Sequence, residues 1–203
     1  MGKRSMLDMK KRIAFIGTIL SLISHGQPLI FKNVVLSSAA LMISLPVNVN
    51  AESAQFYITR ADEKFIKKDY YAAISDYTRA IEIGYPLSYP IRRIGRAKYY
   101  MGDFSGALLY FNQAIAKEPR NRFNYQFRGD AKADMGDNYG AISDYNRAIE
   151  IDPSDPYSYI FSGYAKLNLN DINGACFDWK IAQRKDAKNI FNVDFLLSSY
   201  CSN

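Results

Sequence analysis

The sequence has few of the side chains that most often carry out chemistry. Its 203 residues include one histidine, two cysteines and one tryptophan. The histidine, His25, lies in an apolar N-terminal region that we expect to be removed or membrane-bound. Nucleophiles activated by histidine and histidine-ligated metal sites are therefore excluded from the rest of the chain. No phosphate-binding loop or nucleophile–base pair is present either, so we expect no catalytic residue, no cofactor and no metal.

A large excess of positive charge is also missing outside the N-terminus. The formal net charge is +6, but residues 1–51 contain six basic residues and one acidic residue. Residues 52–203 therefore hold 20 basic and 19 acidic residues, a net charge of +1. Nucleic-acid binding usually needs a concentrated basic surface, so no nucleic-acid partner is expected. The 48% hydrophobic and 23% charged content is that of a globular protein and excludes a disordered chain.

Residues 1–51 have the pattern of an export signal. A basic start is followed by apolar runs at Ile13–Ile23 and Val34–Val47. Both runs are shorter than the roughly 18–20 apolar residues that a membrane span needs. Small residues at Val49 and Ala51 suit cleavage before Glu52. We predict a cleaved signal peptide and export to the periplasm, another lumen or the exterior. The alternative is an uncleaved membrane anchor or a hairpin of the two runs in the membrane, and packing of the two runs as core helices is a third interpretation.

From residue 54 the sequence repeats every 34 residues, in segments 54–87, 88–121, 122–155 and 156–189. Positions 8, 20 and 27 of every segment are Ala or Gly, position 24 is aromatic and position 16 is Asp. Small side chains let two helices approach closely, and an aromatic ring fills the space beside them. Position 8 is occupied by Ala61, Gly95, Gly129 and Gly163, and position 24 by Tyr77, Phe111, Tyr145 and Trp179.

Position 15 is predicted to end the first helix of each segment in the left-handed conformation, which Gly and Asn tolerate. Lys68 is unfavourable at this position, because a lysine resists positive φ. The following Asp is expected to cap the second helix by accepting from free amides. Pro119 and Pro153 are expected to end that second helix.

These residues resemble the tetratricopeptide repeat (TPR), a helix–turn–helix unit of 34 residues. The resemblance covers 136 of the 203 residues and departs from the family pattern at position 11, where Lys replaces the usual Tyr. It implies an all-α fold, a right-handed superhelix (α-solenoid) of four TPR units. The third segment has the most matches, at Tyr125, Gly129, Ala141, Tyr145, Ala148 and Pro153.

The tail, residues 190–203, is expected to form a short helix that caps the fourth unit. Phe191, Phe195, Leu196 and Tyr200 have helical spacing in this tail. A free tail that binds a partner is the alternative.

The resemblance implies that the first helix of each unit lines a concave surface, as it does in TPR proteins. Positions 2, 5, 9 and 12 share one helical face, and in this chain that face is basic and aromatic. We predict that it binds an acidic or aromatic segment of another protein. The alternative is that the aromatic rings pack between units and the arginines are merely solvated. The predicted groove residues are Tyr89, Arg92, Arg96, Tyr99, Phe123, Gln126, Asp130, Tyr157 and Tyr164.

Some TPR proteins grip a C-terminal carboxylate with a Lys/Asn clamp, and this chain lacks that set. Ile58 and Asp62 stand at the matching places of the first unit. The lysines at position 11 are expected to be structural, with Asp76, Asp144 and Asp178 as ion-pair partners. Cys176 and Cys201 are predicted to form a disulfide if the protein is exported, and to stay free thiols in a reducing compartment.

The sequence therefore predicts a non-enzymatic scaffold or assembly factor that holds a partner peptide in its groove outside the cytoplasm. One alternative is a membrane-anchored adaptor in which residues 1–50 recruit a partner to the bilayer. A remote alternative is a small enzyme with an unfamiliar site of Tyr, Arg and Asp in the groove.

Overall fold

A computed structural model describes residues 49–185 and 192–201. They belong to one compact unit, Val49–Asn203. The predicted signal peptide or anchor, with His25, lies outside the described residues apart from its last residues.

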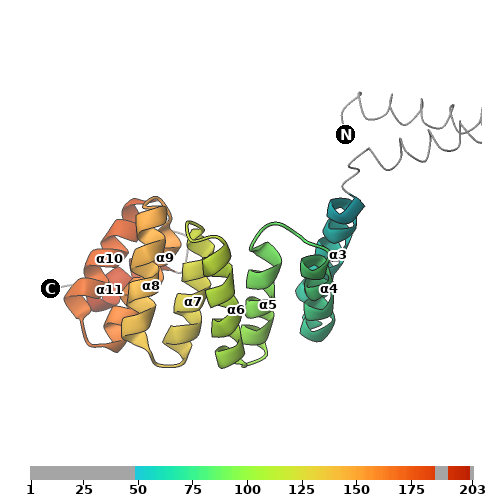
Figure 1. Cartoon of the computed structure of the whole chain (residues 1–203). Coiled ribbons are helices and arrows are strands. Elements are labelled where there is room, and N and C mark those ends of the chain that lie inside the picture. Colours follow the sequence, from blue (N-terminus) through green and yellow to red (C-terminus); the bar gives the residue numbers. More distant parts are fainter. Residues whose placement is uncertain (1–48, 186–191, 202–203) are drawn as a thin grey trace, which may run out of the picture. The chain divides into compact units, whose positions relative to one another are not determined.

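All regular secondary structure in the described residues is helical and none of it is strand, which confirms the predicted all-α fold class. Consecutive helices contact each other from α3 to α11 and lie in chain order (Figure 1). Each 34-residue segment contributes two helices joined by a short turn. The helices are α3 (Val49–Ile66), α4 (Tyr70–Glu82), α5 (Tyr89–Tyr100), α6 (Phe104–Lys117), α7 (Arg122–Asp134), α8 (Asn138–Ile151), α9 (Pro156–Asn168), α10 (Ile172–Arg184) and α11 (Val193–Tyr200).

The turn inside each unit follows the sequence prediction. Position 15 has a positive φ in all four units, at Lys68 (62°), Gly102 (80°), Gly136 (83°) and Asn170 (60°). The next residue, Asp, accepts a hydrogen bond from the amide three residues later in every unit. Its partners are Ala72, Gly106, Gly140 and Gly174. The helices α6 and α8 end two residues before Pro119 and Pro153.

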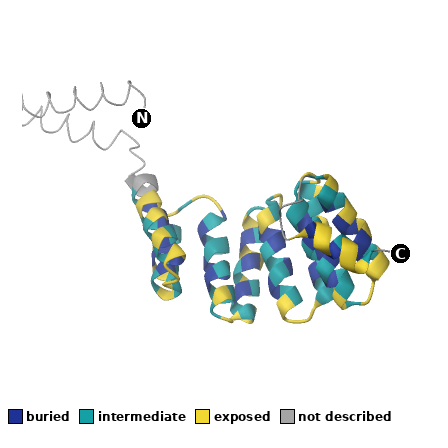
Figure 2. Cartoon of the chain, turned by 180° about the vertical axis from the view of Figure 1, so that it is seen from behind, coloured by how far each residue is buried: buried dark blue, intermediate teal, exposed yellow. Residues whose placement is uncertain are grey.

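Small residues and aromatic rings meet between the two helices of a unit. A Cβ added to Gly95 would lie 2.7 Å from the Phe111 ring, and one added to Gly129 would lie 2.8 Å from Tyr145. Only glycine therefore fits at position 8 of these units without a shift of the ring. The buried residues form continuous strips along the facing sides of the helices (Figure 2).

The two ends of the stack differ from its middle. At position 10, Ala97, Ala131 and Ala165 are buried against the preceding unit, whereas Glu63 of the first unit is exposed. A charged residue here is what a terminal repeat needs in order to face water. At the other end, α11 covers the fourth unit with Val193 and Leu196, which are packed in the Trp179 cluster.

Candidate functional site

The exposed face of the first helices is rotated by one residue from the predicted one. Position 5 is buried in three units, where Ile58, Gln126 and Ile160 are at most 3% exposed. Position 13 is exposed in all four units, at Ile66, Tyr100, Asp134 and Asn168. The open face therefore follows positions 2, 6, 9 and 13, and in the second unit it also includes Arg92 at position 5, which is partly exposed and lies against the position-2 rings of Tyr89 and Phe123; we call this surface the first-helix face. It runs over adjacent helices, because α5 contacts α7 and α7 contacts α9.

Two aspartates of the first-helix face are held by tyrosine hydroxyls. Asp62 accepts hydrogen bonds from Tyr77 of its own unit and from Tyr89 of the next unit, the latter at 2.8 Å. The same arrangement recurs in the third unit. There Asp130 accepts hydrogen bonds from Tyr145 of its own unit at 2.8 Å and from Tyr157 of the next unit at 2.5 Å. We call each set an Asp–Tyr–Tyr clasp. Each clasp joins two neighbouring units.

The second unit has no clasp, and its residues change together. Arg96 replaces the aspartate at position 9, and phenylalanines replace both tyrosines, Phe111 and Phe123. Because Arg96 offers no carboxylate, a tyrosine hydroxyl would have no acceptor there, and the phenylalanine rings pack without a buried polar group. The groove prediction therefore mixes two kinds of residue: Tyr89, Asp130 and Tyr157 belong to clasps, whereas Arg96 and Phe123 do not.

Arg96 lies among aromatic rings. Its guanidinium carbon is 4.4 Å from the Phe127 ring centroid and 5.5 Å from that of Phe65. One Nη donates to the Tyr100 hydroxyl at 3.2 Å. In the part of the chain that the structure describes, no carboxylate lies within 4.0 Å of Arg96. Asp130 interacts with Arg96 electrostatically from beyond this distance, so Arg96 makes no direct ion pair in the described residues.

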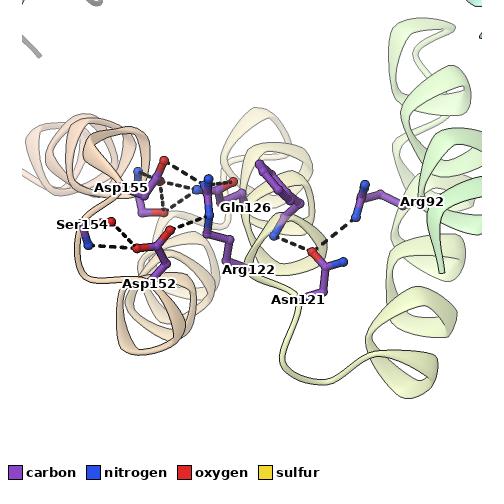
Figure 3. A network of polar contacts seen from close by, with 9 residues as sticks. Arg92, Asn121, Arg122, Gln126, Asp152, Ser154 and Asp155 are labelled. Carbon is purple, nitrogen blue, oxygen red and sulfur yellow. Dashed lines mark hydrogen bonds and ion pairs between the residues drawn. The ribbon is translucent and has the colours of Figure 1, made fainter. Parts of the chain in front are cut away.

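Arg92 is stacked between two rings and held by neutral groups. Its guanidinium carbon lies 5.6 Å from the Tyr89 centroid and 5.3 Å from the Phe123 centroid. Its Nη1 donates to the amide oxygens of Asn121 (3.3 Å) and Asn124 (3.2 Å), the former drawn in Figure 3. Arg92 is partly buried, and the loss of part of its hydration lowers the pKa of its guanidinium. No ion pair of Arg92 is present among residues 49–185 and 192–201.

The prediction that Gln126 lines the groove is wrong in this structure. The Gln126 side chain is buried, and its Nε2 donates to Asp155 Oδ2 at 2.5 Å and to Ser158 Oγ at 2.8 Å. Asp155 also pairs with Arg122, which in turn pairs with Asp152 (Figure 3). Gln126 therefore fixes the α8–α9 loop to α7 and cannot reach a ligand.

The other predicted groove residues are partly exposed. Tyr99 donates to the carboxylate of Asp134 in the next unit. Tyr164 packs against Trp179, with ring centroids 5.7 Å apart. Burial raises the pKa of both tyrosines further above neutral pH.

Sequence reasoning missed Arg93, which the structure places on the same face. Arg93 Nη2 is 3.0 Å from Asp62 Oδ1, and its guanidinium carbon is 3.8 Å from the Phe65 centroid. Phe127, Tyr100 and Asp134 were missed for the same reason, because positions 6 and 13 lay outside the helical face chosen from the sequence. Their helical spacing with positions 2 and 9 was the available signal.

The lysines at position 11 bind the aspartates at position 23, as predicted. Lys64 pairs with Asp76 at 2.8 Å, Lys132 with Asp144 at 2.8 Å and Lys166 with Asp178 at 2.6 Å. In the second unit Tyr110 occupies position 23, and Lys98 pairs with Asp103 instead. These ion pairs join the two helices of a unit, and each of the four position-11 lysines therefore already has a carboxylate partner.

The structure joins Cys176 of α10 to Cys201, directly after α11, in a disulfide with a Cα–Cα distance of 5.7 Å. Among the residues that the structure describes, no helix has the length and apolar content to cross a membrane. In the same residues no group of three or more His, Cys, Asp or Glu side chains could hold a metal ion.

Comparison with known proteins supports the TPR resemblance. A family model described as tetratricopeptide repeat matches residues 124–155. MamA has a similar solved structure (TM-score 0.61, 18% identity, covering 74% of this chain and 85% of that one). So has the first TPR of Spaghetti (RPAP3) bound to the HSP90 peptide SRMEEVD (TM-score 0.57, 20% identity, 61% and 98%). The TPR2B domain of yeast Sti1, in its pHsp70 complex, is also similar (TM-score 0.52, 25% identity, covering 56% of this chain and 95% of that one). A search of curated proteins by sequence found no match. The chain thus has one segment that matches the tetratricopeptide-repeat model, and it shares the fold of these solved TPR structures.

Proposed function

We propose that this protein is a scaffold that binds a segment of another protein on its first-helix face. The observation that carries the proposal is the state of Arg92 and Arg96. Both are fixed by aromatic rings and neutral acceptors, and neither has a carboxylate within 4.0 Å in the described residues. Glu118 and Asp130 interact electrostatically with Arg92 and Arg96, respectively, from beyond ion-pair distance. A cation that is fixed in place without a direct ion pair is suited to bind an anionic group of a partner.

Similar structures support a peptide as the ligand. RPAP3 is similar in fold and is bound to an HSP90 peptide whose last residues are Glu-Glu-Val-Asp. This chain, however, has Ile58 and Asp62 where a Lys/Asn clamp would stand. We therefore propose an acidic or aromatic segment without a required C-terminal carboxylate.

The experiment compares peptide selection by two forms of the full-length protein. Displayed random peptides are selected on the immobilised wild type, and their affinities are then measured for an Arg92→Ala, Arg96→Ala double variant. We expect acidic and aromatic peptides to be enriched and their affinity to fall at least about tenfold in the double variant, since one charged contact is worth roughly 1.5–3 kcal/mol. Arg79→Ala is the matched control, because Arg79 is exposed and pairs with Glu82 on another helix face. Helicity should be equal in all three proteins. Unchanged affinity in the double variant would contradict the proposed site.

We further propose that the scaffold acts outside the cytoplasm, after cleavage before Glu52. The basic start, the apolar runs and the small residues at Val49 and Ala51 support this location. N-terminal sequencing of the protein from its native source tests it. A mature start at Glu52 supports export, whereas an intact N-terminus in a membrane fraction supports the anchored adaptor instead.

A further inference from the structure

Arg92 and Arg96 form two parallel cation–π pairs with α7. Arg92 lies over Phe123 and Arg96 over Phe127, at 5.3 and 4.4 Å from the ring centroids. The two arginines are four residues apart on α5, and the two rings are four residues apart on α7. Four residues of helix rise by about 6 Å, so the two guanidinium groups are spaced by about one helical turn along the first-helix face.

Each guanidinium retains donors for a ligand. An arginine has five N–H donors, and the hydrogen bonds of Arg92 to Asn121 and Asn124 both start from Nη1. Arg96 uses Nη2 for Tyr100. A carboxylate can therefore still bind each guanidinium in the forked geometry that arginine prefers.

Position 5 shows that packing does not require a cation, although Arg92, like Gln126 of the third unit, donates hydrogen bonds to the next unit. The equivalent residues Ile58 and Ile160 are buried apolar side chains. A guanidinium in this place loses water and makes no direct ion pair in the described residues, and the Glu118 carboxylate, which lies beyond 4.0 Å, offsets only part of that cost. An arginine that makes the fold less stable is explained if it contacts a partner.

We propose that the first-helix face recognises an extended peptide with acidic residues at positions i and i+2, one on Arg92 and one on Arg96. Alternate side chains of an extended chain point the same way and recur about every 6.6–6.8 Å. This repeat is close to the rise of about 6 Å between Arg92 and Arg96 along α5. Adjacent acidic residues point to opposite sides, and residues three apart are separated by about 10 Å. This inference rests on the proposed function and adds the spacing of the ligand's charges.

The surroundings favour a peptide over a nucleic acid. Asp130 interacts electrostatically with Arg96, and Asp134 lies one turn further along α7. A continuous polyanion would meet both carboxylates and be repelled. A peptide with two acidic residues followed by aromatic residues would instead reach Phe161 and Tyr164 of α9, whose ring centroids are 5.9 Å apart.

Fluorescence anisotropy with the full-length protein tests the spacing. The labelled probes share a Ser/Gly frame and differ in three central residues: Glu-Tyr-Glu, Glu-Glu-Tyr, and Glu-Tyr-Gln. Single-stranded oligouridylate is the fourth probe. We expect Glu-Tyr-Glu to bind about tenfold more tightly than either other peptide. Arg96→Gln should remove this advantage and Arg79→Gln should leave it intact.

The outcomes separate the spacing from the proposed function. If all acidic peptides bind equally and depend on Arg92 and Arg96, the site is correct and the i, i+2 spacing is wrong. If oligouridylate binds more tightly than every peptide, both the spacing and the peptide scaffold are overturned. If no acidic probe binds at concentrations up to about 1 mM, an affinity that corresponds to roughly −4 kcal/mol, the spacing is overturned, and peptide selection on the wild type then decides the function separately.

Discussion

At the scale of single residues, the most informative side chain is Arg92. The equivalent residues in the other three units, Ile58, Gln126 and Ile160, are buried and uncharged, whereas Arg92 carries a cation. The rings of Tyr89 and Phe123 and the amides of Asn121 and Asn124 offset part of the desolvation cost. They do not supply a negative charge. Stability should therefore favour an apolar residue at this position, whereas binding of an acidic partner should favour arginine.

Replacing Arg92 with methionine should separate stability from binding. Methionine is of similar length and apolar, so we expect the free energy of unfolding to stay within about 1 kcal/mol of the wild type or to rise. Binding of acidic peptides should fall at least about tenfold, as for the loss of a charged contact. Arg128→Met is the contrasting variant, because it removes a partner of the buried Asp144 and should destabilise the protein. Urea denaturation measures the stability of both variants. A loss of several kcal/mol in the free energy of unfolding of Arg92→Met would show that Arg92 is structural.

The Asp–Tyr–Tyr clasp of Asp130 holds a carboxyl group whose pKa is raised in the folded protein. Burial raises the pKa of Asp130 from 3.8 to about 6, and the hydroxyls of Tyr145 and Tyr157 and the charge of Arg96 limit the rise. Asp134 of the same helix adds to the rise by repulsion. A group whose pKa is higher in the folded state favours folding while protonated. Its contribution to stability is therefore present below the unfolded pKa and lost as the pH rises through about 6.

The pH dependence of stability should therefore carry a signature of Asp130. Between pH 4 and pH 6.5 we expect the wild type to lose about 1–3 kcal/mol relative to an Asp130→Asn variant, which does not titrate. The lowered pKa of Asp76, caused first by its hydrogen bond to Arg60, affects stability only at more acidic pH. Thermal unfolding of both proteins across this range measures the difference. A constant difference in stability between the two proteins would mean that Asp130 does not have the raised pKa.

At the scale of elements, the turn inside each hairpin needs one left-handed residue. Gly102 and Gly136 adopt positive φ at little cost, whereas Lys68 holds φ at 62° with a full side chain. Its φ is close to that of Asn170, so the turn geometry is kept and the strain is local. A Cβ in the left-handed region costs about 1–2 kcal/mol.

Lys68→Gly should therefore stabilise the first unit by about 0.5–1 kcal/mol, after the extra flexibility of glycine in the unfolded chain is deducted. Gly136→Lys should have the opposite effect in the third unit, because it introduces the same strain. A control, Lys117→Gly within the last turn of α6, should destabilise. Denaturation midpoints rank the three variants. Equal midpoints for Lys68→Gly and the wild type would show that the left-handed lysine is not strained.

The sequence predicts these elements well because each signal is local. The turn residue at position 15 and the Asp cap at position 16 act within a few residues of each other, and all four caps form. The groove is harder, because positions 5 and 6 are adjacent and only packing against the next unit decides which one is buried. Gln126 was assigned to the surface for this reason, and Arg93 was missed. The clasps were readable, since Asp62 and Asp130 each come with two tyrosines and Arg96 with two phenylalanines.

At the scale of the whole stack, stability depends on contacts between neighbouring units, so the ends decide how far fraying extends. Glu63 makes the first unit a terminal one, and α11 covers the last. The cap is small, with eight residues in α11 and two buried side chains, Val193 and Leu196. Gln183 adds a hydrogen bond to Asp194 at 2.7 Å. These contacts are few for an end cap, and the disulfide between Cys176 and Cys201 is the covalent addition to them.

Removal of the disulfide should therefore loosen the cap and leave the middle of the stack intact. The two cysteines are 25 residues apart, and closing a loop of that length is worth about 3 kcal/mol in the unfolded chain. In a Cys176→Ala, Cys201→Ala variant we expect faster hydrogen exchange in α11 and α10, with unchanged exchange in α5–α8, because coupling in a solenoid passes from neighbour to neighbour. Mass spectrometry of the non-reduced wild type first establishes that the bond forms, and two free thiols there would overturn it. Equal exchange of α11 in both proteins would mean that the apolar contacts of Val193 and Leu196 hold the cap without the bond.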